Sequence, residues 1–241
     1  MKFTTACIHG GGPNDATGAV SPALYLTSTF AHPGVGQSTG WAYTRESNPT
    51  HARLEKVLST LEGGTDALCF SSGMAAIDAV MRLFAPGDHL ITGFDLYGGS
   101  FRLFRTTYEP LGLTFTPVHT SDLKAVEEAI TPATRGIYLE TPTNPTMEIT
   151  DLEALSDLAH RHQLLVIVDN TFLSPCFPAA PDPGLRTSWS TAAPSTWPAT
   201  TICWPVSSSA GKMKWQPVSG PSTRPPEPCS ASLTPGSCSG A

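Results

Sequence analysis

The stretch from Leu164 to Phe172 reads L-L-V-I-V-D-N-T-F and decides the fold class. Its first five residues are all branched aliphatics, a run typical of a strand that is buried on both faces of a parallel sheet. The polar residues Asp169 and Asn170 follow that run directly. Because ligands of open α/β sheets bind beyond the carboxyl ends of the strands, this stretch predicts a central strand and one wall of a binding site.

Strands and helices alternate along the chain before this stretch. Apolar patterning predicts strands at 66–70, 89–92, 113–118, 136–140 and 164–168, and helices at 51–61, 72–84, 99–108, 121–130 and 151–162. Ser121 and Asp151 are the expected caps of the last two helices. Such regular alternation predicts the α/β class, with a mainly parallel sheet and helices on both of its faces.

The composition of the 241 residues narrows the function classes. A hydrophobic content of 40% is enough for a core, and a formal net charge of −6 gives no support for nucleic-acid binding. The first residues lack the apolar run of a signal peptide, and no stretch stays apolar for long enough to cross a membrane. The six cysteines show no metal-ligand spacing. We therefore expect a cytoplasmic protein without a metal site, a nucleic-acid partner or a membrane partner.

The chain changes character near Cys176. Residues 176–241 hold 12 Pro, 12 Ser and four of the five Trp, and each proline removes a backbone donor and fixes φ. We expect residues 178–241 to be an irregular Pro/Ser/Trp-rich tail. Residues 51–177 are expected to form an incomplete α/β domain. The loop-rich residues 1–50, with scattered Gly and Pro, are expected to form an N-terminal arm.

Two of the polar clusters at the predicted strand ends can each be interpreted as part of a ligand site or as ordinary structure. In S-S-G-M-A-A, Gly73 and Met74 open a helix whose free N–H groups can hold a phosphate, although a tight, capped helix start would look the same. Asp169 would be costly to bury unless paired, for instance with the protonated ring nitrogen of a cofactor. A helix cap or an edge hydrogen bond is the alternative role for this carboxylate.

Four further residues can be interpreted in two ways. Tyr97 could stack on a flat ring or be an ordinary rim aromatic. Asn144 stands between two prolines, so its stiff backbone could present the amide to a ligand or simply form a turn. Tyr43 and Arg45 lie on the arm, where arginine suits bidentate phosphate binding, although a solvated surface arginine is equally compatible with the sequence.

Together these residues fall within six short motifs that carry a family resemblance. The motifs are A-Y-T-R-E-S-N-P-T (42–50), L-E-G-G (61–64), F-S-S-G-M-A-A-I (70–77), D-L-Y-G-G-S (95–100), E-T-P-T-N-P (140–145) and V-D-N-T-F (168–172). In this order and at this spacing they resemble the signatures of the trans-sulfuration (Cys/Met metabolism) enzymes, which use pyridoxal 5'-phosphate. The cystathionine γ-synthase and cystathionine lyase type belongs to this family. The resemblance runs from about residue 5 to residue 175, and it implies an aspartate-aminotransferase-like fold.

The resemblance also implies roles for single residues. Gly73 and Met74 are similar to the backbone donors for the cofactor phosphate. Tyr97 resembles the tyrosine that stacks on the cofactor ring and takes part in proton transfer. Asp169 resembles the carboxylate that keeps the ring nitrogen protonated, and Asn144 resembles the residue near the ring oxygen and the substrate carboxylate.

The arm is similar to a family feature that crosses between subunits. Tyr43 and Arg45 resemble the pair that binds the phosphate in a neighbouring subunit's site. The resemblance therefore implies a homo-oligomer, a dimer or a tetramer, that acts on a small sulfur amino acid.

One residue that the family needs is missing. A lysine that holds the cofactor as a Schiff base is expected in a segment resembling V-V-H-S-G-T-K-Y, after the last strand. The chain has five lysines, none of them in that context: Lys2, Lys56, Lys124, Lys212 and Lys214. We therefore expect a member of the family that forms or cleaves C–S bonds but is inactive as written.

The odd tail is compatible with a change of reading frame. Codons shifted by one frame across residues 189–206 permit V-H-S-G-T-K-Y-L-A-G-H-N-D-L-L-A-G, with the lysine codon falling across Pro194 and Ser195. This predicts a frame change between residues 176 and 185 and a truncated chain. Two alternatives stay open: a non-catalytic protein that binds pyridoxal phosphate or a partner, and an unrelated α/β protein whose tail is an interaction segment.

Overall fold

The computed structural model describes residues 2–11, 17–173, 188–192 and 200–205. Helices and the π-helix η1 are found at α1 (Phe3–His9), α2 (Pro49–Leu61), α3 (Gly73–Met81), α4 (Gly98–Leu103), η1 (Phe104–Tyr108), α5 (Leu123–Glu128) and α6 (Leu152–Arg161). Strands are found at β1 (Gly64–Phe70), β2 (His89–Gly93), β3 (Thr114–Val118), β4 (Thr134–Glu140), β5 (Leu165–Asp169), β6 (Ser188–Ala192) and β7 (Thr200–Pro205). None of the helices in these described residues is both long and apolar enough to cross a membrane.

The helices and strands predicted between residues 51 and 168 are all present, with two local differences there and a third in the arm. The helix predicted at 99–108 is split into α4 and the π-helix η1. The cap of α5 is Asp122, whose side chain accepts from the N–H groups of Lys124 and Ala125, so Ser121 was the wrong cap. Helix α1 lies in the arm that was expected to be loop-rich. The cap at Asp151 is confirmed, since its side chain accepts from Ala154.

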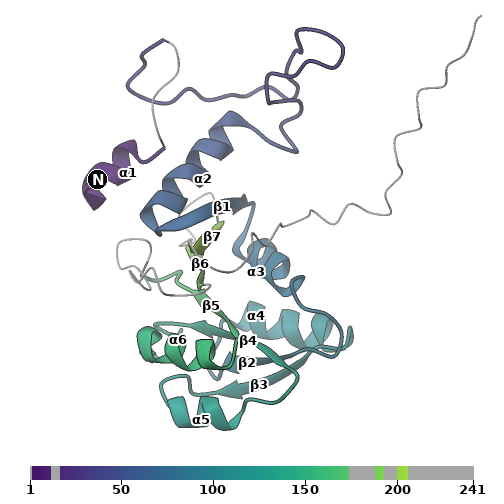
Figure 1. Cartoon of the computed structure of the whole chain (residues 1–241), viewed down its shortest axis with the longest axis vertical. Helices are drawn as coiled ribbons and strands as arrows, with labels where there is room; N and C mark the ends of the chain where they lie inside the picture. Colours follow the sequence, from purple (N-terminus) through teal and green to yellow (C-terminus); the bar gives the residue numbers. More distant parts are fainter. Residues whose placement is uncertain (1, 12–16, 174–187, 193–199, 206–241) are drawn as a thin grey trace, which may run out of the picture. The chain divides into compact units, whose positions relative to one another are not determined.

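The strands form one sheet in the order β1-β7-β6-β5-β4-β2-β3. The pairs from β3 through β2, β4 and β5 to β6 are parallel, and only β7 runs against its two neighbours. The predicted class, a mainly parallel sheet in an α/β fold, is therefore confirmed. Figure 1 shows the helices α5 and α6 beside the strands β2 to β5.

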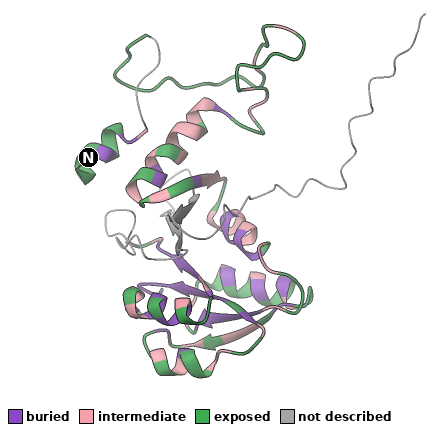
Figure 2. Cartoon of the chain, in the orientation of Figure 1, coloured by how far each residue is buried: buried purple, intermediate pink, exposed green. Residues whose placement is uncertain are grey.

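Alternation of side chains along the central strands builds a core on each face of the sheet. Tyr138 packs with α3 and η1, whereas its neighbours Ile137 and Leu139 pack with α5 and α6. The same alternation holds in β5, where Ile167 lies on the α3 side and Val166 on the α6 side. Figure 2 shows these strands as the most continuously buried part of the described chain. Burial on both faces explains why β5 reads as an unbroken apolar run.

The direction of strand addition reverses at β2. After β2 the chain adds β3 on one side, and it then crosses to add β4 on the other side, followed by β5. Loops that leave β2 and β4 therefore diverge from a shared line at the carboxyl ends of these strands. Such switch points are where open α/β sheets bind ligands.

The prediction of an irregular tail is wrong for two segments. The strands β6 and β7 lie inside it, between β5 and β1. Their sequences gave no apolar run to indicate a strand, but strand pairing uses backbone N–H and C=O groups, which every non-proline residue carries. The other residues of the predicted tail lie outside the described part of the chain, and the division at residues 50 and 177 stays a prediction.

Candidate functional site

Two acidic residues end the neighbouring strands β4 and β5 and lie directly opposite each other. Glu140 pairs in register with Asp169, and their residues are only 5% and 7% exposed. Asp169 accepts hydrogen bonds from the Tyr138 hydroxyl at 3.3 Å, from the Thr171 N–H at 3.2 Å and from the Thr171 hydroxyl at 2.6 Å. Strand register thus brings two carboxyl groups together at the carboxyl edge of the sheet.

Glu140 also connects β4 to the loop that follows β2. One of its carboxylate oxygens accepts from the Tyr97 N–H at 3.0 Å. Burial, followed by the charges of Asp169 and Asp95, raises the pKa of Glu140 to about 7, while the Tyr97 N–H works in the opposite direction. The hydrogen bond crosses the place where strand addition reverses, so Asp169, Glu140 and Tyr97 form one linked group.

These two carboxyl groups have no cationic side chain to balance them in the described part of the chain. None of the ion pairs found there involves Glu140 or Asp169. A buried carboxylate without a cationic partner is unfavourable, and a second carboxylate beside it makes the position worse. The site therefore fits a ligand that carries a buried positive group, as the protonated ring nitrogen of pyridoxal phosphate does.

Tyr97 and the start of α3 meet at Gly99. A Cβ atom placed on Gly99 would lie 2.3 Å from Cε1 of Tyr97 and 2.9 Å from the Met74 sulfur. The aromatic ring and the first turn of α3 therefore approach the same point, and the lack of a side chain at Gly99 permits this approach. The structure thus brings Met74 and its neighbour Gly73 together with Tyr97.

The first turn of α3 keeps donors available for a ligand. The Ser72 hydroxyl caps the helix by accepting from the Ala75 N–H at 3.2 Å. Gly73 and Met74 precede that capped donor, so their N–H groups belong to the set that a helix cannot satisfy internally. Such groups suit an anionic oxygen, which agrees with the phosphate role expected for these two residues.

Asn144 lies on the loop that follows β4, four residues after Glu140, and its side chain is exposed. The loop is held by hydrogen bonds within itself, from the Thr143 N–H to the Glu148 carbonyl at 3.1 Å and between the Thr143 and Thr146 hydroxyls at 2.7 Å. Asn144 thus follows a strand at the same sheet edge as Asp169, none of the hydrogen bonds found among the described residues joins the two, and its ligand role stays a prediction.

Tyr43 and Arg45 pair with each other on the arm, apart from the group around Asp169. The Arg45 guanidinium donates to the Tyr43 hydroxyl at 2.7 Å and lies 5.2 Å from the centre of its ring. An isolated antiparallel bridge joins Tyr43 to Thr29 in this part of the arm. Among the described residues, none of the hydrogen bonds of this pair reaches Asp169, Glu140 or Tyr97.

Sequence reasoning missed Glu140 as a site residue, although it stands in the motif E-T-P-T-N-P. Its signal was the same as that of Asp169, an acidic residue placed directly after an apolar strand. Its importance depends on pairing with Asp169 and on the contact with Tyr97, and both of these follow from strand order.

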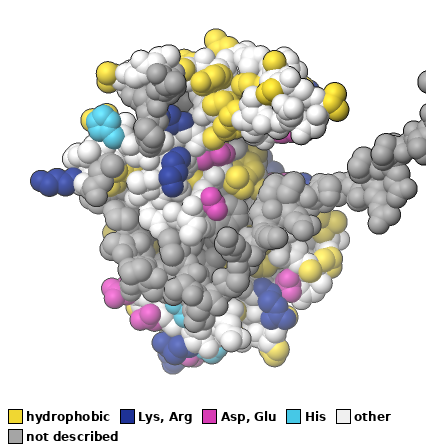
Figure 3. All heavy atoms as spheres, turned by 45° about the horizontal axis from the view of Figure 1, so that its top comes forward, with side chains coloured by type: hydrophobic (Ala, Val, Ile, Leu, Met, Phe, Trp, Pro, Cys, Tyr) yellow, Lys and Arg dark blue, Asp and Glu magenta, His cyan; other side chains and the backbone are white. Residues whose placement is uncertain are grey.

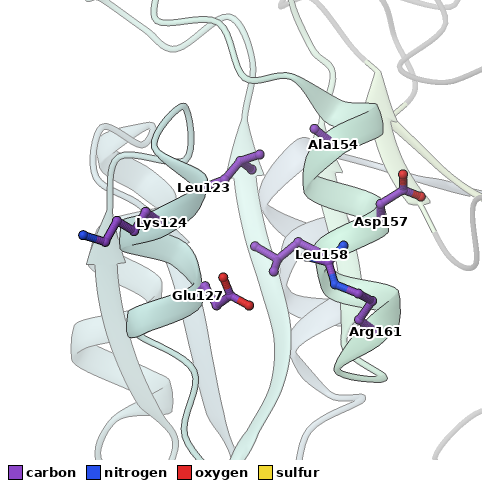
Figure 4. A pocket seen from close by; sticks show the side chains of 7 residues that line it. All are labelled: Leu123, Lys124, Glu127, Ala154, Asp157, Leu158 and Arg161. Carbon is purple, nitrogen blue, oxygen red and sulfur yellow. The ribbon is translucent and has the colours of Figure 1, made fainter.

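A separate groove runs between α5 and α6 (Figure 4). It is lined by Leu123, Lys124, Glu127, Ala154, Asp157, Leu158 and Arg161. None of the predicted site residues borders it, and cationic and anionic side chains are mixed along it. The described residues also contain no group of three His, Cys, Asp or Glu side chains that could hold a metal ion.

Known proteins are similar to this chain in both sequence and fold. A cystathionine γ-lyase of Bacillus subtilis is 49% identical over 178 residues, which is 73% of this chain and 47% of that protein. A cystathionine γ-synthase of Mycobacterium leprae is 48% identical over 176 residues, covering 72% of this chain and 45% of that protein. The crystal structure of cystathionine γ-lyase from Lactobacillus plantarum complexed with L-serine has a TM-score of 0.79 at 46% identity, covering 86% of this chain and 55% of that one.

The chain spans about half the length of these relatives. The family model described as "Cys/Met metabolism PLP-dependent enzyme" matches residues 4–184, about three quarters of the 241 residues. With the six motifs, the sheet order and these relatives in agreement, the chain belongs to the Cys/Met metabolism family of pyridoxal-phosphate-dependent enzymes.

Proposed function

We propose that this chain carries the cofactor-binding region of an enzyme that forms or cleaves C–S bonds in small sulfur amino acids. The observation that carries the proposal is the buried pair Glu140 and Asp169, which lacks a cationic partner among the described residues and is linked to Tyr97. When bound, pyridoxal phosphate supplies a ring that accepts electrons from the substrate. The protein's part is to hold that ring, its charge and its phosphate in place.

The ring nitrogen, the ring face and the phosphate of the cofactor each have protein groups suited to bind them. Asp169 would keep the proton on the ring nitrogen, because its carboxylate is buried and already fixed by Tyr138 and Thr171. The Tyr97 ring would cover one face of the cofactor ring. The N–H groups of Gly73 and Met74 would bind phosphate oxygens.

The amine that the family's chemistry requires has no counterpart among the described lysines. The three lysines that the structure describes, Lys2, Lys56 and Lys124, are all exposed. Lys124 lies on α5, 3.7 Å from Glu128. None of these three is placed like the buried amine that the family's chemistry requires. Lys212 and Lys214 lie outside the described residues, and neither stands in the sequence segment expected for that amine, so we infer that this chain binds the cofactor without turnover.

A second copy of the chain is the proposed partner. The arm exposes large apolar side chains, among them Val20 at 86%, Leu24 at 73% and Leu26 at 94%. Figure 3 shows such hydrophobic side chains open on the face it draws. Because water-exposed apolar residues gathered on one segment favour association, we propose that the arm lies against another subunit. There Tyr43 and Arg45 would bind the cofactor phosphate in the site of the neighbouring subunit.

The substrate is proposed only as a class. Relatives named γ-lyase, γ-synthase and β-lyase are 49%, 48% and 42% identical to this chain, so identity does not separate their reactions. We propose a small sulfur amino acid, and the cytoplasm as the place of action.

Cofactor titration tests the proposal. The full chain is titrated with pyridoxal phosphate and binding is followed by cofactor absorbance and protein fluorescence, with Asp169→Asn and the matched exposed-helix control Asp157→Asn. We expect Asp169→Asn to weaken binding roughly 10- to 100-fold, because a hydrogen bond between charged groups contributes about 1.5–3 kcal/mol. Asp157→Asn should bind as the original chain does. Equal binding by all three chains would overturn the proposed site. An absorbance band of covalently attached cofactor would overturn the proposed lack of a Schiff-base lysine.

A further inference from the structure

Glu140 occupies a position between the two groups that would touch the cofactor. On one side it pairs in register with Asp169, and on the other it accepts from the Tyr97 N–H at 3.0 Å. Tyr97 is the residue that precedes the first turn of α4, and its carbonyl accepts from the Phe101 N–H at 3.1 Å. The Tyr97 side chain makes no capping hydrogen bond at the start of α4. The described contact that ties the Tyr97 backbone to the sheet is therefore the one to Glu140.

The groups facing Glu140 come from three parts of the fold. Asp169 faces it from β5, Asp95 from the loop after β2, and Tyr138 from β4 itself. Tyr138 stays neutral because burial raises its pKa well above its usual range. The two charges that act on Glu140 are thus both negative, and Asp169 is the stronger influence.

We infer that Glu140 is a positioning residue that senses the charge at Asp169 and sets how firmly the backbone of Tyr97 is held. The inference rests on the proposed function, because it takes the cofactor ring as the group that changes this charge.

The physical sequence has two steps. As long as no cation lies beside Asp169, repulsion from its carboxylate favours the protonated form of Glu140, and a pKa of about 7 leaves Glu140 half protonated at neutral pH. A cationic ring nitrogen placed at Asp169 would cancel that repulsion, so Glu140 would lose its proton. The ionised carboxylate then accepts a stronger, charge-assisted hydrogen bond from the Tyr97 N–H.

The stronger hydrogen bond would affect the position of the Tyr97 ring. This ring packs against Gly99 beside the Met74 sulfur, so a firmer backbone at Tyr97 restricts where the ring can lie. Binding at Asp169 would in this way tighten the group that covers the cofactor. By linkage, ionising Glu140 with rising pH would favour cofactor binding to the same extent.

The first test needs no cofactor. Hydrogen exchange of the Tyr97 amide is measured by NMR in the full chain between about pH 6 and about pH 8, corrected for the intrinsic rate. We expect protection to rise roughly tenfold as Glu140 ionises, because charge-assisted hydrogen bonds are about twice as strong as neutral ones. In Glu140→Gln, which keeps an acceptor but cannot ionise, protection should stay flat. The exposed control Glu128→Gln should behave as the original chain does. A flat profile in the original chain would overturn the inference.

The second test measures the proton that binding releases. Calorimetry of pyridoxal phosphate binding at pH 7 is repeated in buffers of different ionisation enthalpy, for the original chain and for Glu140→Gln. Protons released by the cofactor itself are common to both chains and cancel in the difference. Because Glu140 is half protonated at a pKa of about 7, the original chain should release up to about half a proton more than the variant.

The outcomes separate the inference from the function on which it rests. Binding with equal proton release by both chains would overturn the coupling to Asp169 and leave the cofactor site standing. An absence of binding, with the pH profile of the Tyr97 amide intact, would overturn the proposed function and with it the cofactor as the trigger.

Discussion

The two ends of the same parallel sheet bury titratable side chains in opposite ways. At the amino end, His89 begins β2 with 5% exposure, and its ring nitrogens lie 2.7 Å from the Thr134 hydroxyl and 2.8 Å from the Thr116 hydroxyl. At the carboxyl end, Glu140 and Asp169 lie side by side. One end gives each polar atom a neutral partner, whereas the other places like charges together.

This difference separates a structural polar group from a binding one. Burial lowers the pKa of His89, so the imidazole stays neutral, and two hydroxyls satisfy it. Burial raises the pKa of Glu140 and the neighbouring charge raises it further, so this pair remains costly within the described chain. Such a pair calls for a positive group that the described residues do not supply, which is why the carboxyl end and not the amino end is the candidate site.

The largest change in stability is expected for a substitution at the amino end of the sheet. His89→Ala removes a buried ring and leaves the Thr116 hydroxyl without its partner, so we expect a loss of about 2–4 kcal/mol in the free energy of unfolding. Cofactor affinity should not change, because the ring lies at the opposite edge of the strands. Urea denaturation and cofactor titration measure the two quantities.

His51→Ala, at an exposed position on α2, is the matched control and should change stability by less than about 0.5 kcal/mol. Reduced cofactor affinity in folded His89→Ala would remove the distinction between the two ends.

At the carboxyl end, by contrast, we expect a substitution to raise the free energy of unfolding. Because the folded pKa of Glu140 is about 7 and the unfolded value is 4.5, the folded state binds the proton more tightly, and stability is lost as pH rises through this window. Glu140→Gln removes that loss, so the variant should exceed the original chain at pH 8 by about 1–3 kcal/mol and show little gain at pH 4.5. Urea denaturation across this pH range measures the difference.

Glu128→Gln, with an exposed side chain on α5, should give no pH-dependent gain. A Glu140→Gln chain that is less stable than the original at pH 8 would mean that the carboxylate has a cationic partner after all.

The helices and strands between residues 51 and 168 could be predicted from the sequence, because burial leaves a pattern of apolar residues along the chain. Apolar runs marked β4 and β5, and helical spacing marked α3 and α6. Asp169 was predictable as a site residue because a lone acid after an apolar run needs a partner. Glu140 has the same local pattern, but its pairing with Asp169 exists only once β4 and β5 are neighbours.

The remaining differences have equally physical causes. Strands β6 and β7 left no apolar signature, since their placement depends on backbone pairing with β5 and β1. The change from α4 to the π-helix η1 is a local shift of hydrogen bonding that apolar spacing does not encode. The sequence match to the family ends at residue 184, inside the interval 176–185 in which a frame change is predicted. Sequencing of the coding DNA through codons 170–210 tests that prediction.

The smallest expected effect distinguishes two adjacent glycines at the carboxyl end. A Cβ on Gly98 would meet nothing within 4 Å, whereas one on Gly99 would lie 2.3 Å from the Tyr97 ring and 2.9 Å from the Met74 sulfur. Gly98→Ala should therefore stabilise α4 by about 0.5–1 kcal/mol, as alanine does in helices, and leave cofactor affinity unchanged. Gly99→Ala should lose most of this gain, because the flexible ring and thioether must move aside, and it should weaken cofactor binding several-fold. Equal affinities for the two variants would show that the position of the Tyr97 ring does not matter for binding, and the carboxyl end would then differ from the amino end in charge alone.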